Sequence, residues 1–199
     1  MGRHTSPNRP ALLRVRAVLA GALVLGVGAT LTLAAWTDSE HAKADFTASV
    51  FGIQGDPGTG YAEHSTSGTA AQLTFGTAGS AMSPGAVVHG RLDVRTTAAS
   101  TIGGTVALSA STPSGASVIT NNLTYRVAVV DTATSCAAAT YSGTAVPASS
   151  VFAPAQATVA AAAGNARRFC FEVRLASGTP NSAQGQSGSI TWQVTGTSD

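Results

Sequence analysis

The densest group of side chains able to bind a cation or exchange protons is Asp38, Glu40, His41 and Asp45. Carboxylate oxygens and imidazole nitrogens are common metal ligands. A metal site also needs supporting contacts that hold its ligands in place. These four residues fall in a polar stretch ahead of the first strand-like segment, so we interpret them as a solvated leader. We predict no metal site and no cofactor.

Motifs of known enzyme chemistry are missing from the rest of the sequence. There is no HExxH, which would place two histidines and a glutamate on one helix face, and His64 and His89 are far apart. A G-x-S-x-G nucleophile motif and a glycine-rich phosphate loop are absent too. We therefore predict that the protein has no catalytic residues and is not an enzyme.

The two cysteines, Cys136 and Cys170, are the other candidates for chemistry. An even number of cysteines in an exported protein favours a disulfide. Closing a loop of about 35 residues would stabilise the fold by about 3–4 kcal/mol in the chain-entropy model. A metal pair or reactive thiols are the alternatives, but no CxxC motif or neighbouring histidine supports them.

The N-terminal region has the pattern of an export signal. Arginines at positions 3, 9, 14 and 16 precede an uncharged run from Ala17 to Ala35. A basic head, an apolar run and small residues at its end are typical of a secretory signal peptide. A membrane anchor is the alternative, because such a run spans about 28 Å as a helix. Its glycine content favours a cleaved signal, so we predict a signal peptide over residues 1–35.

Two cleavage sites compete. Ala42-Lys43-Ala44 has the small-x-small pattern before Asp45, and Leu33-Ala34-Ala35 directly ends the apolar run before Trp36. Signal peptidase acts at the membrane surface, which favours the cut between Ala35 and Trp36. The remaining residues, 36–199, are enough for a single domain with its own core.

Charge excludes a nucleic-acid partner for the exported part. Residues 36–199 contain seven basic and nine acidic residues, a net charge of −2, so the positive balance of the full chain belongs to the signal region. Nucleic-acid binding would need a clustered basic face. We expect no membrane contact after cleavage. The excess of arginine over lysine, with abundant alanine and glycine, suggests a GC-rich genome such as an actinobacterial one.

Apolar and polar residues alternate with period two in five segments after residue 80. These segments are Val88–Thr96, Thr105–Ser111, Leu123–Val130, Arg168–Ala176 and Gly188–Gly196. Such alternation indicates strands with one face on a core and the other in water. Turn signals separate them, including Thr112–Gly115, and Phe46–Ile53 and Ala71–Phe75 are two further candidate strands.

This pattern predicts an all-β fold, an antiparallel β-sandwich of jelly-roll type, with an immunoglobulin-like sandwich as the alternative. One segment fits less well. Ala153–Ala166 is rich in alanine and could form a short helix or a small-residue loop. It lies between the two cysteines, so a disulfide would tether it.

The signal region resembles that of the TasA/camelysin family, whose export depends on the dedicated signal peptidase SipW. The resemblance rests on AAWTDSE at residues 34–40, ADFTAS at 44–49 and FGI at 51–53. Ser49 occupies a position that is usually glycine in the family. Met82–Gly85 before a strand, Phe169–Leu175 and Ile190–Trp192 resemble family strands more loosely. The resemblance implies cleavage between Ala35 and Trp36 by the dedicated peptidase.

The resemblance further implies a secreted protein of the cell surface or biofilm matrix that polymerises with itself into fibres. Residues 36–53 would then form a leader and donor segment. Its Phe46, Ala48, Val50 and Ile53 would add as a strand to an open edge of a neighbouring copy. Two alternatives remain: a camelysin-like secreted metallopeptidase, and a monomeric extracellular binding module.

Overall fold

A computed structural model describes residues 10–30 and 38–199 of the chain, which divides into one unit up to Phe46 and another from Thr47 to Asp199. The first unit contains α1 (Pro10–Thr30) and an extended segment, residues 38–46, without helix or strand. Within the described ranges, no helix has both the length and the apolar character needed to cross a membrane. The predicted cleavage residues Ala35 and Trp36 lie outside the described residues.

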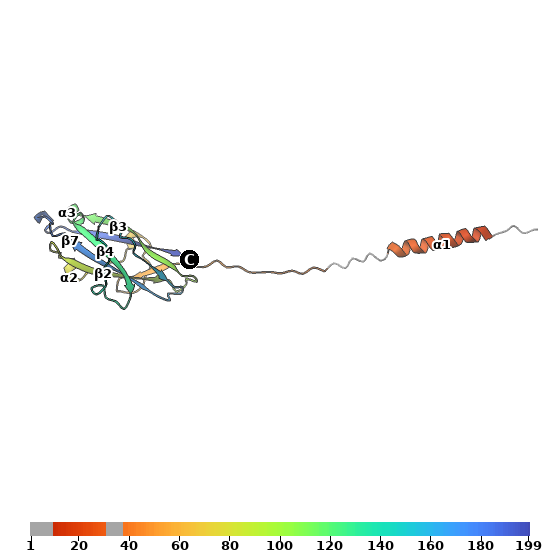
Figure 1. Ribbon diagram of the computed structural model, residues 1–199, viewed down its shortest axis with the longest axis horizontal. Helices are drawn as coiled ribbons and strands as arrows, with labels where there is room; N and C mark the ends of the chain where they lie inside the picture. The colour runs from red at the N-terminus through yellow and green to blue at the C-terminus, as the bar shows by residue number, and fades with distance from the viewer. Residues whose placement is uncertain (1–9, 31–37) are drawn as a thin grey trace, which may run out of the picture. The chain divides into compact units, whose positions relative to one another are not determined.

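The second unit is a sandwich of two antiparallel sheets (Figure 1). One sheet has five strands in the order β1-β2-β7-β4-β5, and the other has three in the order β6-β3-β8. The strands are β1 (Ile53–Asp56), β2 (Val87–Thr96), β3 (Gly104–Gly115), β4 (Leu123–Asp131), β5 (Val146–Pro147), β6 (Gln156–Val159), β7 (Arg167–Leu175) and β8 (Gly188–Ser198). The short helical turns are η1 (Ser67–Thr69), α2 (Gly76–Gly79), α3 (Ser117–Thr120) and η2 (Asn181–Ala183).

The predicted all-β sandwich is confirmed, and all five alternating segments form strands. Their apolar residues meet between the sheets, where Tyr125, Phe169 and Phe171 are fully buried. Burying a side chain such as phenylalanine stabilises a fold by about 1.5–3 kcal/mol. The choice between a jelly-roll and an immunoglobulin-like topology stays a prediction.

Two predicted strands and one predicted turn were wrong. Residues 46–52 and Ala71–Phe75 are not strands, and β3 continues through the predicted turn at Thr112–Gly115. Proline has no N–H to donate, but β6 pairs with β3 only as far as Ala107. On the side of β3 that faces away from β8, Pro113 therefore has no partner strand that would need this hydrogen bond. In residues 46–52, the carbonyl of Val50 accepts a hydrogen bond from Thr101 N at 2.8 Å rather than from a neighbouring strand.

The alanine-rich segment Ala153–Ala166 forms neither a helix nor a simple loop. Its centre is β6, which pairs with the first residues of β3, and a turn follows with Ala162 and Ala163 at positive φ. Thr96 holds this turn, because its hydroxyl donates to Ala160 O at 2.6 Å and accepts from Ala163 N at 3.0 Å. Such contacts offset the cost of left-handed backbone at residues with a Cβ.

Candidate functional site

A groove of about 1220 Å³ opens between β8 and the β1–β2 side of the five-stranded sheet. One wall consists of Val88, Leu92 and Val94 from β2, and the opposite wall includes Ile190 and Trp192 from β8. Leu73, Phe75 and Met82, which lie between β1 and β2 in sequence, also line it and pack against the core. The mouth is polar. The walls therefore suit an apolar chain that carries hydrogen-bonding groups.

Gly90 allows Phe75 to lie directly on β2. A Cβ at Gly90 would come within 2.7 Å of two atoms of the Phe75 ring, which is closer than van der Waals contact allows. Glycine therefore lets this ring pack flat inside the groove. The Phe75 ring in turn lies 6.2 Å from that of Trp192, measured between centroids.

Trp192 brings both a large ring and a hydrogen-bond donor to the groove wall. Its ring lies 4.4 Å from Phe171 and 5.5 Å from Tyr125, between centroids. The indole Nε1 is buried and has no hydrogen-bond partner among the described residues. A buried N–H without an acceptor costs about 1–3 kcal/mol. An acceptor that entered the groove beside Trp192 would recover that cost.

The edge of β8 is open. In the part of the chain that the structure describes, β8 pairs with β3 and with no other strand. Its eleven residues include no charged residue and no proline. Charges, prolines and bulges are the usual means by which proteins prevent an edge from pairing with another strand. The opposite edge of the same sheet, β6, has only four residues.

The structure separates the four predicted donor residues into two groups. Phe46, with 93% of its surface exposed, and Ala48 are exposed and lie outside any strand. Val50 is half exposed, and its backbone bonds to Thr101. Ile53 belongs to β1, pairs with Thr96 and packs against the core.

A second notable region is the outer face of the five-stranded sheet, where Arg168 and Asp93 form a buried ion pair. Arg168 Nε and Nη2 donate to the two oxygens of Asp93 at 2.6 and 2.7 Å, and its Nη1 donates to Thr134 O at 2.9 Å. The hydrogen bonds to Asp93 raise the pKa of Arg168. The alternating pattern predicted a wet face, which was wrong around Asp93, Arg168 and Cys170, because residues 132–145 cover this part of it.

A disulfide holds that cover in place, as predicted: Cys136 is bonded to Cys170 on β7. Both cysteines are buried. The Tyr141 hydroxyl donates to Cys136 O at 2.8 Å, and Arg126 Nη1 donates to Tyr141 O at 3.4 Å. Burial, with a smaller effect of Glu172, raises the pKa of Tyr141 to about 12.

Beside the buried ion pair, a shallow pocket of about 510 Å³ is lined by His89, Arg91 and Ser135 among others. His89 Nε2 lies 3.6 Å from Glu172 Oε2, which is too long for a hydrogen bond. Glu172 instead accepts from Arg126 Nε and Nη2 at 2.9 and 2.7 Å. This arrangement is a structural ion-pair network.

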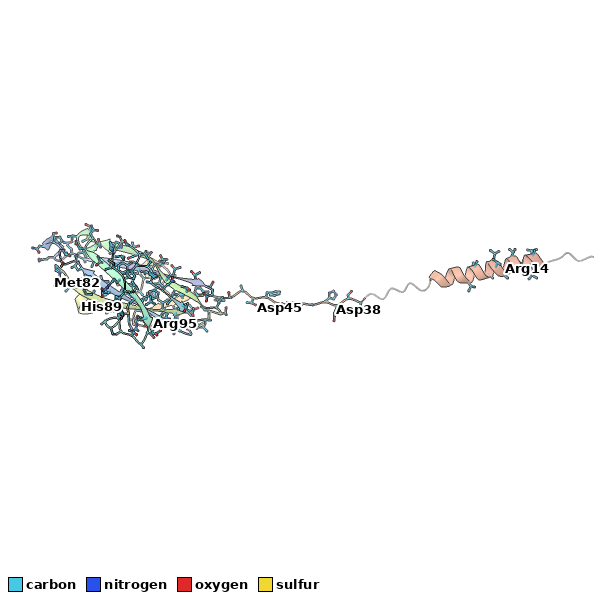
Figure 2. The ribbon with its side chains drawn as sticks, in the orientation of Figure 1. Arg14, Asp38, Asp45, Met82, His89 and Arg95 are labelled. Carbon is cyan, nitrogen blue, oxygen red and sulfur yellow. A yellow bond between two sulfur atoms is a disulfide. The ribbon has the colours of Figure 1, made fainter. Side chains whose placement is uncertain are left out.

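The structure does not bring together the four potential metal ligands ahead of the first strand. Asp38, Glu40, His41 and Asp45 are exposed along the extended segment, where Figure 2 labels Asp38 and Asp45. Lys43 Nζ lies 3.0 Å from Asp45 Oδ1, with both side chains mostly exposed. Among residues 10–30 and 38–199, no three histidine, cysteine, aspartate or glutamate side chains are grouped closely enough to hold a metal ion.

These features define a class of protein: a disulfide-linked, antiparallel β-sandwich with an open edge strand beside an apolar groove. Comparison with protein-family models and with curated proteins finds no match. The similarity to the TasA/camelysin family therefore stays a prediction.

Proposed function

We propose that this protein is an exported structural protein that polymerises with itself at the cell surface or in a biofilm matrix. The segment ahead of β1 in one copy adds as a strand to β8 of the next copy. The observation that carries the proposal is the uncharged, eleven-residue edge of β8 beside an apolar groove, in a chain that also exposes Phe46. Removal of residues 1–35 as a signal peptide and membership of the TasA/camelysin family belong to the same proposal.

Backbone hydrogen bonds to β8 supply affinity in this arrangement, and alternate donor side chains supply specificity. Phe46 and Ala48 are two residues apart, so both face the groove when the segment is extended. Ile53 is engaged in its own β1, so the donor comprises residues before Val50.

The first test replaces Phe46 in protein that starts at Trp36. Phe46→Asn removes an apolar anchor worth about 1.5–3 kcal/mol when buried, so the concentration needed for polymerisation rises by about tenfold or more. Val151→Asn is the matched control, because Val151 is 41% exposed and lies outside the donor and the groove. Sedimentation and electron microscopy measure the polymer. Equal assembly of F46N and wild type contradicts the proposal.

The second test blocks the acceptor edge. Gln193 and Gln156 are both exposed glutamines, on β8 and on the opposite edge strand β6. A lysine on an edge strand disfavours pairing with a further strand. Gln193→Lys therefore prevents polymerisation while Gln156→Lys permits it. The reverse result would place the acceptor edge on β6.

A further inference from the structure

Charge is distributed unevenly between the parts of this chain. The sandwich from Thr47 onward has six arginines and six carboxylate side chains, and β3, β6 and β8 contain no charged residue. The extended segment 38–45 has three carboxylates, from Asp38, Glu40 and Asp45, and one lysine, a net charge of −2. The segment is thus acidic, and the sandwich is neutral in sum.

Five of the six arginines share the outer face of the five-stranded sheet. They are Arg91, Arg95, Arg126, Arg168 and Arg174. Period-two alternation and the register between β2, β7 and β4 place them together, since Asp93 faces Arg168, and Glu172 faces both His89 and Arg126. Among the described residues of these strands and of β1, the acidic ones on this face are Asp56, Asp93 and Glu172, which leaves an excess of two positive charges. We call it the arginine face.

Two of these arginines form hydrogen-bonded ion pairs within the fold, Arg168 with Asp93 and Arg126 with Glu172. The other three have no hydrogen-bonded carboxylate partner among the described residues, although Arg91 lies near both Asp93 and Asp56. Arg91 Nη1 is 3.6 Å from Asp93 Oδ2, an oxygen that already accepts from Arg168. Arg95, labelled in Figure 2, stacks on the Tyr61 ring with its guanidinium carbon 3.7 Å from the ring centroid. Arg174 is exposed and forms no ion pair within the described residues.

We propose that the arginine face binds the acidic segment 38–45 of the neighbouring copy in the polymer. This inference rests on the proposed function, in which the donor strand brings that segment to the next copy. Carboxylates of that segment then pair with Arg95 and Arg91, and the contact fixes the orientation of one copy on the next. Charge complementarity at a surface contributes mainly to orientation and to the rate of association.

The chain is long enough for this contact. Eight extended residues span about 26 Å, whereas two packed sheets lie about 10 Å apart. A Cβ on Gly196 of β8 would lie 2.8 Å from Ile53 Cγ2, so the open edge of β8 runs close to β1. A segment that leaves β8 can therefore pass around β1 and reach Arg95 and Arg91 on the outer face of β2.

The test uses charge reversal in protein that starts at Trp36. One variant, D38K/E40K/D45K, reverses the acidic segment, and another, R91E/R95E/R174E, reverses the arginine face. We expect each variant alone to need about tenfold more protein to polymerise than wild type, since the exposed contacts between the segment and the arginine face become repulsive. An equimolar mixture of the two variants polymerises at the wild-type concentration, because each segment meets a face of opposite charge on another copy. Thermal unfolding checks that both variants fold.

Ionic strength provides a second measurement that needs no variant. Salt shortens the Debye length to about 3 Å at 1 M, so wild-type polymerisation slows as salt is added. D38K/E40K/D45K that assembles as readily as wild type contradicts this inference alone and leaves strand donation intact. A mixture of the two variants that assembles no better than either variant alone also contradicts this inference. That result would mean that the acidic segment binds the arginine face of its own copy. Wild-type protein that stays monomeric contradicts both proposals.

Discussion

The two outer faces of the sandwich come from the same alternating strand pattern but differ in what covers them. On the five-stranded sheet, residues 132–145 lie over β2 and β7 and are fixed by the disulfide and by the Arg168–Asp93 pair. On the three-stranded sheet, the outward residues are mostly uncharged hydroxyl groups, such as Thr105, Thr158 and Thr197 in one row across the strands. The outer face of the five-stranded sheet is thus partly buried, and the outer face of the three-stranded sheet is exposed.

This difference shows that polarity alone does not identify the solvent side of a strand. Asp93 and Arg168 are charged residues of alternating strands, yet they are 4% and 7% exposed. Buried charges are tolerated because each saturates the other's hydrogen-bonding groups. The uncharged face needs no such pairing, and its long edge is available for association.

The largest effect is expected when one charge of the buried ion pair is removed. Asp93→Ala leaves Arg168 buried without its counter-ion, which costs about 3–5 kcal/mol of unfolding free energy. Urea unfolding measures the loss. Asp131→Ala is the matched control, because Asp131 pairs with Arg167 at a site where its side chain is 76% exposed. That change costs at most about 1 kcal/mol. Equal losses would mean that residues 132–145 do not shield the Asp93 site.

Removing the disulfide tests the same cover from its other attachment. Cys136→Ala/Cys170→Ala frees a loop of about 35 residues in the unfolded state and lowers the unfolding free energy by about 3–4 kcal/mol. Because residues 132–145 lose an anchor, hydrogen exchange rises there and on β7 while β3 and β8 keep their protection. A uniform rise across both sheets would show that the disulfide stabilises the whole sandwich rather than this face.

Much of the fold could be predicted from the sequence, because period-two alternation is a local signal. β2, β4, β7 and β8 appear within one or two residues of their predicted ends. The misplaced boundaries depend on distant partners. Whether Thr112–Gly115 turns or continues as strand depends on β8, which supplies Thr191 and Ile190 as partners. The position of β1 depends on its register with β2.

The candidate site was less accessible to sequence reasoning. Phe46 and Ala48 could be identified as candidate donor residues because they belong to an alternating segment that also resembles the family. The groove could not, since it arises where Phe75, from the segment between β1 and β2, meets Trp192 of β8. The register that brings Asp93 opposite Arg168 is likewise a long-range feature. The sequence showed only two opposite charges within separate strands.

A smaller effect is expected at high pH, where the covered face contains a titratable group. Burial raises the pKa of Tyr141 to about 12, from the ordinary tyrosine value of 10.0. Its protonated form is therefore favoured in the folded state, and this stability is complete below pH 10 and is lost as the pH rises toward 12. Ultraviolet titration of phenolate absorbance should show a late step that Tyr141→Phe removes. A late step that survives this substitution would belong to another tyrosine.

The smallest effect is expected on the uncovered face, at Thr195 of β8. Its hydroxyl lies 2.6 Å from that of Ser109, but both residues are exposed, so water replaces the lost bond. Thr195→Val keeps the shape and the β-branching and shifts the unfolding free energy by no more than about 0.5 kcal/mol. Thermal unfolding measures this. A loss comparable to that of Asp93→Ala would mean that the three-stranded face is covered as well, and the contrast between the two faces would disappear.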